Sequence, residues 1–176
     1  MANYRRYRVK GGTYFFTVAI YNRRQALLVD YIDALRDAFA EVKRAHPFHI
    51  DAIVILPEHM HCIWTLPEGD DAFSMRWRQI KSAFTEQLPD VEPRSASRKR
   101  KGERGIWHRR FWDHVIRDDN DFARHVDYIH FNPVKHGWVK QVADWPYSTF
   151  FRYVERGVYP LSWGSDYSDD LEVAGE

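Results

Sequence analysis

Cysteine is nearly missing from this chain of 176 residues, because Cys62 is the only one. A single thiol excludes an intrachain disulfide and a zinc site built from several cysteines, and it suits a reducing compartment. The sequence also lacks an apolar run that approaches the ~20 residues of a membrane-spanning helix. No charged-then-apolar signal segment opens it. We therefore expect a cytoplasmic protein that does not contact a membrane.

Net charge is small as well, with a formal value of +1 at pH 7. The charges are unevenly distributed. Residues 94–110 hold eight Lys or Arg and one Glu, whereas residues 165–176 hold five Asp or Glu and no Lys or Arg. A solvated loop can carry such a basic block. The aromatic residues from Trp107 to Trp112 favour instead a surface that binds a polyanion, because charge and stacking rings then lie side by side.

The composition favours a folded domain. Hydrophobic residues make up 44% of the chain and aromatic residues 16%, enough for a core and for exposed rings that stack on unpaired bases. An aromatic-rich core explains the same numbers. We expect one domain over residues 1–164, with a flexible basic loop at about 89–105, and an acidic tail at 165–176.

The order of the expected elements indicates the fold class. Alternating, β-branched stretches predict strands, and apolar residues at helical spacing predict helices. We expect strands at 13–21, 48–56, 60–66 and 111–116 and helices at 30–45, 73–88 and 118–131, with Asp30 as a helix N-cap and Pro133 as a helix stop. This β-α-β-β-α-β order predicts an α+β, ferredoxin-like antiparallel sheet with helices on one face, plus an additional helix and a C-terminal extension.

Two histidines stand two residues apart in the apolar run from Ile53 to Trp64. Side chains alternate along a strand, so His59 and His61 point to the same face. Each imidazole offers a lone pair, and the pair forms half of a site for a divalent metal ion. Two surface histidines on a half-exposed strand would give the same spacing, and an ion would need further donors.

The helix expected at 118–131 contains a second candidate group. At about 100° per residue, Asp121, His125, Tyr128 and Asn132 fall in one narrow polar stripe, so the four can line one side of a cleft. A tyrosine attacks phosphorus only if the phosphate is made more electrophilic or the phenol proton is removed. A metal ion on the histidine pair would do the first. The alternative is a core tyrosine with one polar atom.

Several short strings resemble one family. His59-Met60-His61 matches the His-hydrophobic-His motif of the HUH superfamily. The strings Arg110 to His114, Tyr128 to Gly137 and Tyr147 to Phe150 resemble the REP-associated tyrosine transposases, where REP denotes a repetitive extragenic palindrome. The strings occur in the family's order, and the resemblance spans roughly residues 5–160.

The resemblance implies a substrate and a mechanism as well as the ferredoxin-like fold. The substrate would be single-stranded DNA with a small palindromic hairpin and a short flanking guide sequence. Tyr128, on a catalytic helix, would attack the scissile phosphate, form a 5′-phosphotyrosine and release a 3′-hydroxyl. His59 and His61 would complete the catalytic set by holding one Mg²⁺ or Mn²⁺. The resemblance also implies that the protein is a monomer, with a dimer as the alternative.

The third metal ligand is left open by the resemblance. Related insertion-sequence enzymes use a glutamine four residues after the tyrosine. Here that position is Asn132, a shorter amide, and His125 is the alternative ligand.

Basic side chains from three segments are candidates for contacts to DNA phosphates. They come from the N-terminal arm, the helix at 73–88 and the basic block, and they are Arg5, Arg6, Arg8, Arg76, Arg78, Lys81, Arg98, Lys99, Arg100, Lys101, Arg109 and Arg110.

Two other functions fit the same residues. A metal-dependent nuclease would use the histidines with water as the nucleophile and would cleave without a covalent adduct. A non-enzymatic module would bind single strands by stacking on exposed aromatic rings, with or without metal. The family resemblance favours the strand transferase.

Overall fold

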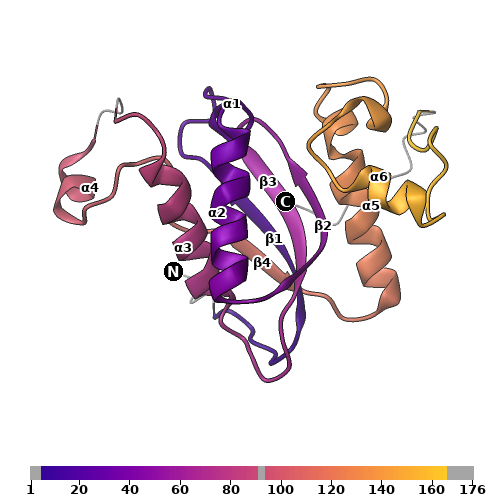
Figure 1. Cartoon of the computed structure of the whole chain (residues 1–176), viewed down its shortest axis with the longest axis horizontal. Helices are drawn as coiled ribbons and strands as arrows, with labels where there is room; N and C mark the ends of the chain where they lie inside the picture. Colours follow the sequence, from indigo (N-terminus) through magenta and orange to yellow (C-terminus); the bar gives the residue numbers. More distant parts are fainter. Residues whose placement is uncertain (1–4, 91–93, 166–176) are drawn as a thin grey trace.

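The centre of the molecule is a four-stranded antiparallel sheet with the strand order β2-β3-β1-β4 (Figure 1). The computed structural model describes residues 5–90 and 94–165. The strands are β1 (Thr13–Ala19), β2 (His49–Ile55), β3 (His59–Thr65) and β4 (Trp112–Val115). β2 and β3 form a hairpin, as expected. The element order and the pairing confirm the ferredoxin-like α+β fold.

The helices lie on both sides of the sheet. α2 and α3 pack on one face, while α5 and α6 lie on the other (Figure 1). Their bounds are α1 (Leu27–Asp30), α2 (Ile32–Ala45), α3 (Phe73–Glu86), α4 (Ala96–Arg100), α5 (Asp119–Lys135) and α6 (Phe150–Glu155), with a 3-10 turn at Val142–Asp144. The two ferredoxin-like helices therefore share a face, and the additional helix α5 covers the opposite one.

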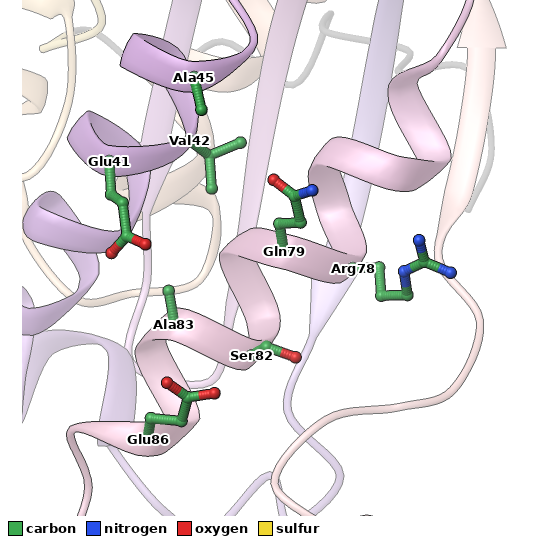
Figure 2. A pocket seen from close by; sticks show the side chains of 8 residues that line it. All are labelled: Glu41, Val42, Ala45, Arg78, Gln79, Ser82, Ala83 and Glu86. Carbon is green, nitrogen blue, oxygen red and sulfur yellow. The ribbon is translucent and has the colours of Figure 1, made fainter.

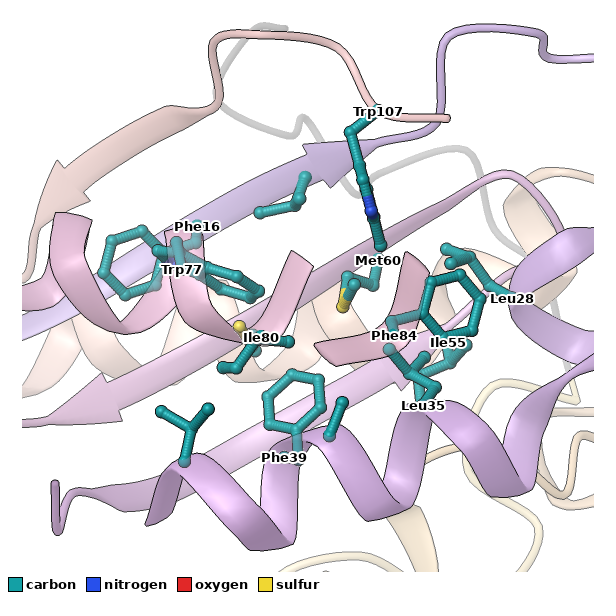
Figure 3. Close-up of a cluster of buried hydrophobic side chains, with 14 of the residues drawn as sticks. Phe16, Leu28, Leu35, Phe39, Ile55, Met60, Trp77, Ile80, Phe84 and Trp107 are labelled. Carbon is teal, nitrogen blue, oxygen red and sulfur yellow. The ribbon is translucent and has the colours of Figure 1, made fainter. Parts of the chain in front are cut away.

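The face under α2 and α3 carries the larger hydrophobic core. Alternate residues of β1 and β3 enter it, among them Phe16 and Trp64. The indole of Trp77 from α3 stacks on Trp64 with ring centroids 4.2 Å apart. Figure 3 shows how Phe39 from α2 and Trp77 from α3 reach the same cluster. Burial of each such side chain stabilises the fold by about 1.5–3 kcal/mol.

The face under α5 is built by the intervening residues of the same strands. Phe15 and Ile63 meet Val126 and Ile129 of α5, and all four are buried. Because successive strand residues alternate between faces, β3 is covered on both sides, and six of its seven residues are buried. His59 and His61 share the face of Ile63, so they point towards α5.

Helix α5 passes through Pro133 and ends at Lys135, so the expectation that Pro133 stops the helix is wrong. A proline this close to a helix end removes a single backbone donor. The helix then closes with two hydrogen bonds, from Gly137 N to Val134 O and from Trp138 N to Pro133 O, each 2.9 Å. Gly137 takes the left-handed φ of 73° that this closure requires. Asn132 consequently lies inside the helix.

Three other expectations need correction or lie outside the described residues. Asp30 ends α1, and Tyr31 rather than Asp30 occupies the N-cap of α2. The segment expected to be a loop at 89–105 contains α4, whose first turn is capped by Ser95 accepting from Arg98 N. The acidic tail lies outside the described residues except for Ser165.

No helix among the described residues is long and apolar enough to cross a membrane. A groove of about 290 Å³ runs between α2 and α3 (Figure 2). Glu41, Arg78 and Glu86 are among the described residues that line it, and these include no histidine and no tyrosine. The candidate site lies on the other face of the sheet.

Arg76 is buried, which corrects its expected role as a phosphate contact. Its side chain is only 2% exposed and forms an ion pair of 2.6 Å with Asp70. The same guanidinium donates to the carbonyl oxygens of His46, Pro47 and Ala72. It therefore ties the end of α2 to the start of α3 and cannot also reach a ligand.

Replacing Arg76 by methionine should lower the free energy of unfolding by about 2–4 kcal/mol, because three carbonyls and a carboxylate lose their donor. Urea denaturation of the purified variant measures this. Arg78→Met on the exposed face of α3 is the matched control and should change stability by less than about 0.5 kcal/mol. Equal stability of the two variants would contradict the structural role of Arg76.

Candidate active site

His59 and His61 lie side by side at the start of β3, with ring centroids 4.9 Å apart. Both are buried. His59 Nδ1 donates to the Glu58 carboxylate at 3.0 Å, and His61 Nδ1 forms a hydrogen bond of 2.8 Å with Thr17 Oγ1. Each Nδ1 is thus engaged by a neighbour, which orients both rings and leaves the Nε2 atoms as the positions available to a ligand.

Both imidazoles favour the neutral form. Burial lowers the pKa of His59, although the Glu58 carboxylate opposes that shift. Burial lowers the pKa of His61 far more, and the neighbouring His59 adds to it. A neutral imidazole keeps the lone pair that a metal ligand needs.

Tyr128 faces this pair from α5. Its ring centroid lies 5.0 Å from that of His61, and the residue is 7% exposed. The Phe15 ring contacts both of them, with its centroid 5.6 Å from that of His61 and 6.0 Å from that of Tyr128. Val126 and Ile129, on either side of Tyr128 in the sequence, pack α5 onto the sheet. The structure therefore brings the tyrosine and the two histidines together.

Asn132 and His136 follow Tyr128 at intervals of one helical turn. His136 contacts His59 with ring centroids 5.2 Å apart. Because Tyr128 faces His61 and His136 faces His59, Asn132 lies midway and faces the gap between the two histidines. His136 lies within the family-like string from Tyr128 to Gly137, and its i, i+4 spacing from Asn132 is the sequence signal that places it beside the site.

No protein-family model matches the chain. A REP-associated tyrosine transposase of Escherichia coli (strain K12) is 56% identical over 169 residues, which cover 96% of this chain and 94% of the relative. The chain belongs to the REP-associated tyrosine transposases. A related sequence from Haemophilus influenzae is 47% identical and covers 100% of this transposase. The solved structure of a REP-associated tyrosine transposase bound to a REP hairpin matches with a TM-score of 0.83 and 54% identity, over 100% of this chain and 98% of that one.

Membership of this transposase family implies a divalent metal ion, and the residues between β3 and α5 fit one. Among the described residues, His61 Nε2 and both amide atoms of Asn132 are buried without a hydrogen-bond partner. A buried polar atom without a partner costs about 1–3 kcal/mol. An amide oxygen suits magnesium or manganese, and a neutral imidazole nitrogen is a common metal ligand, so a bound ion would satisfy both.

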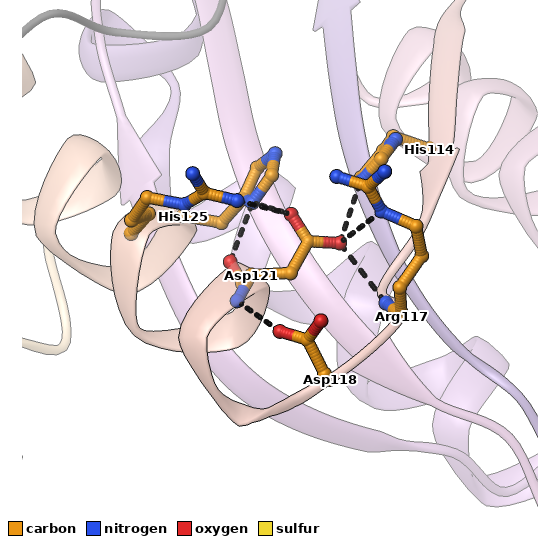
Figure 4. Close-up of polar contacts among 6 residues, drawn as sticks. His114, Arg117, Asp118, Asp121 and His125 are labelled. Atoms are coloured by element: carbon orange, nitrogen blue, oxygen red, sulfur yellow. Dashed lines mark hydrogen bonds and ion pairs between the residues drawn. The ribbon is translucent and has the colours of Figure 1, made fainter.

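A second polar group of the transposase lies at the start of α5 (Figure 4). His114, Asp121 and His125 present ligand atoms within 4.8 Å of one another. Asp121 Oδ2 already accepts from His114 Nε2 and from Arg117 N, both at 2.9 Å. Burial raises the pKa of Asp121, but these hydrogen bonds and the nearby histidines outweigh it and lower the pKa to about 2.

This second group fits an anchor better than a metal site. The guanidinium of Arg117 lies 3.4 Å from the Asp121 carboxylate and that of Arg124 lies 3.8 Å away. Two positive charges at this distance oppose a cation. The Asp121 carboxylate also accepts a hydrogen bond from the backbone N–H of Arg117, which lies between β4 and α5. Asp121 therefore holds the N-terminal end of α5, the helix that carries Tyr128, against β4.

His125 belongs to this anchor. Its Nδ1 donates to Asp121 O at 2.7 Å, and its ring stacks on His114 with centroids 4.8 Å apart. The polar stripe expected from the sequence therefore faces the sheet as a whole but divides into two groups. Asp121 and His125 meet β4, whereas Tyr128 and Asn132 meet the histidines of β3.

The remaining basic candidates also divide. Arg6 forms an ion pair with Asp113 at 2.8 Å, Lys81 donates to His108 O at 3.0 Å, and Arg98 lies 4.6 Å from the Tyr21 ring. Burial lowers the pKa of Lys81 to about 8. Their side chains are engaged within the protein. The exposed members of the set are Arg5, Arg8, Arg78, Lys99, Arg100, Lys101, Arg109 and Arg110, of which Arg8 pairs with Asp71 and Arg109 with Glu103.

Besides His136, three neighbours of the site were not predicted from the sequence. Thr17 orients His61, Glu58 orients His59, and Lys135 places its ammonium 4.9 Å from the centre of the Tyr128 ring. Glu58 directly precedes His59 and could have been noticed. Thr17 becomes visible only through the pairing of β1 with β3, where it lies opposite His61.

Proposed function

We propose that this transposase cleaves and rejoins single-stranded DNA at REP-type hairpins, with Tyr128 as the nucleophile. The observation that carries the proposal is the placement of the Tyr128 ring 5.0 Å from the ring of His61, which is paired with His59. A phenol beside two neutral imidazoles, on a helix packed over them, suits attack on a phosphate held at the same point.

In each step of the reaction, one bond between phosphorus and oxygen forms as another breaks. The Tyr128 oxygen forms a bond to the scissile phosphorus and loses its proton, while the bond from phosphorus to the 3′-oxygen breaks. The 3′-oxygen leaves with the electron pair and takes up a proton, so the products are a 5′-phosphotyrosine and a 3′-hydroxyl. Attack of another 3′-hydroxyl on the phosphotyrosine reverses these changes and frees Tyr128. One phosphodiester replaces another, and no external energy source is needed.

His59 and His61 would hold one Mg²⁺ or Mn²⁺ through their Nε2 atoms, with the carbonyl oxygen of Asn132 as the third ligand. The bound ion supplies polarisation of a phosphate oxygen. Asn132 is preferred over His125 because its buried amide has no hydrogen-bond partner among residues 5–90 and 94–165, whereas His125 is bonded to Asp121. Glu58 and Thr17 keep the two rings oriented towards the ion.

Lys135 contributes charge next to the nucleophile. Its ammonium lies over the Tyr128 ring at 4.9 Å, so it favours the negative charge that develops on the phenol oxygen as the proton leaves. The side chain itself is exposed and can also approach the phosphate of a bound strand.

The exposed basic residues would bind the DNA backbone. A relative with 54% identity was solved with a REP hairpin bound, and the same kind of ligand suits this chain. Lys99, Arg100 and Lys101 at the end of α4 are exposed. Lys101 lines a cavity of about 670 Å³ between α3 and the basic block of residues 94–110. Such a surface holds phosphates without reading sequence.

Incubation with a labelled REP-type hairpin oligonucleotide and Mn²⁺ should give a protein–DNA adduct that survives denaturing electrophoresis. Tyr128→Phe should abolish the adduct and leave hairpin binding intact, because only the attacking oxygen is removed. Tyr147→Phe on the same side of the sheet is the control and should form the adduct normally. Cleavage without an adduct would indicate water as the nucleophile, and binding without metal-dependent cleavage would indicate a non-enzymatic module; either result contradicts the proposal.

Changing Lys99, Arg100 and Lys101 together to glutamine should weaken hairpin binding and reduce the slope of log K against log salt by about 2–3, because each lost phosphate contact removes about 0.7–0.9. Fluorescence anisotropy at a series of salt concentrations measures the slope. The control changes Arg36, Lys43 and Arg44 of α2 to glutamine, which removes the same charge elsewhere. A slope reduced equally in both variants would show that total charge, rather than this segment, controls binding.

A further inference from the structure

We propose that Trp112 stacks on a base of the single strand next to the scissile phosphate. The inference rests on the proposed function and deepens it, since it assigns a position for a nucleotide rather than a phosphate. Trp112 is 45% exposed at the start of β4, an edge strand of the sheet. Large exposed rings beside basic groups are the feature by which proteins hold unpaired bases.

Strand pairing places Trp112 in the same row as the active site. Trp112 lies opposite Thr17 of β1, and Thr17 lies opposite His61 of β3. Residues directly opposite one another share a face, so the indole projects from the face that carries the histidine pair. Neighbouring strands are about 4.8 Å apart, which puts the backbone of Trp112 about 10 Å from that of His61.

The indole is also held in a fixed orientation. It lies parallel to the ring of His114, with a 3° angle between the planes and centroids 5.9 Å apart. Its edge meets Phe15 at 5.8 Å. His114 is in turn fixed by Asp121 and His125. A ring that is already oriented loses little conformational entropy when a base stacks on it.

Phe15 links this ring to the reacting groups. It contacts Trp112, His61 and Tyr128. Aromatic rings therefore run without interruption from the exposed indole to the nucleophile. A strand whose phosphate lies at Tyr128 can follow this line, with one base on Trp112.

The charges around Trp112 favour a nucleic acid over a protein partner. Arg110 is exposed two residues before it. Arg117 and Arg124, whose side chains are 68% and 69% exposed, are held around Asp121 beside His114. These three exposed cations, before β4 and around the start of α5, suit the phosphates of a strand that stacks a base on the indole.

The test compares binding of two hairpins in the Tyr128→Phe background with a chelator present, so that no cleavage occurs. One hairpin carries single-stranded flanks and the other is trimmed to its duplex. Trp112→Leu keeps apolar bulk against Phe15 but has no π face, and it should weaken binding of the flanked hairpin by roughly 5- to 150-fold. It should leave the trimmed hairpin unaffected, and Trp112→Phe should restore most of the affinity.

The control is Trp138→Ala, which removes another half-exposed tryptophan, 50% accessible, and should change neither affinity. Equal losses on both hairpins, or no loss on the flanked one, would overturn the inference. A Trp112→Leu variant that melts at a lower temperature and is not rescued by Trp112→Phe would show a packing role instead, which also overturns it. The adduct assay on the unaltered protein is independent of these results, so failure of the stacking inference and failure of the proposed function are distinguishable.

Discussion

The packing of α5 on the sheet is the interaction on which the candidate site depends. Val126 and Ile129 meet Phe15 and Ile63, and this contact sets the height of the helix above β3. The same contact forces polar side chains of α5 into the interior. Asp121 and His125 form hydrogen bonds there, whereas the Asn132 amide and His61 Nε2 have no hydrogen-bond partner within the described part of the chain. The helix thus carries a cost in stability at the point where a ligand would relieve it.

The two faces of the sheet have different chemistry because the strands alternate. Phe16, Cys62 and Trp64 point into the larger hydrophobic core, under α2 and α3. Phe15 and His61 point to the face under α5, where aromatic and polar groups mix. A well-packed core on one side can hold the strands rigid while the other side positions reacting groups within the small tolerance that catalysis needs.

Local periodicity predicted much of this arrangement. Period two placed His59 and His61 on one face, and the helical period placed Asp121, His125, Tyr128 and Asn132 on one stripe. All six residues are buried between α5 and the sheet. What the periodicity could not supply is the partner across the gap. His125 meets β4 rather than β3, and Arg76 is buried because Asp70 and the end of α2 close over it. Both facts depend on contacts between segments distant in the sequence.

The position of the metal ion tests the central claim most directly, because the phenol of Tyr128 and the two imidazoles are useful only if they meet one ion and one phosphate. Anomalous diffraction from Mn²⁺-soaked crystals of the Tyr128→Phe variant would locate it. The account predicts a single strong peak within bonding distance of His59 Nε2, His61 Nε2 and Asn132 Oδ1. A peak among His114, Asp121 and His125, with none at the β3 histidines, would contradict it.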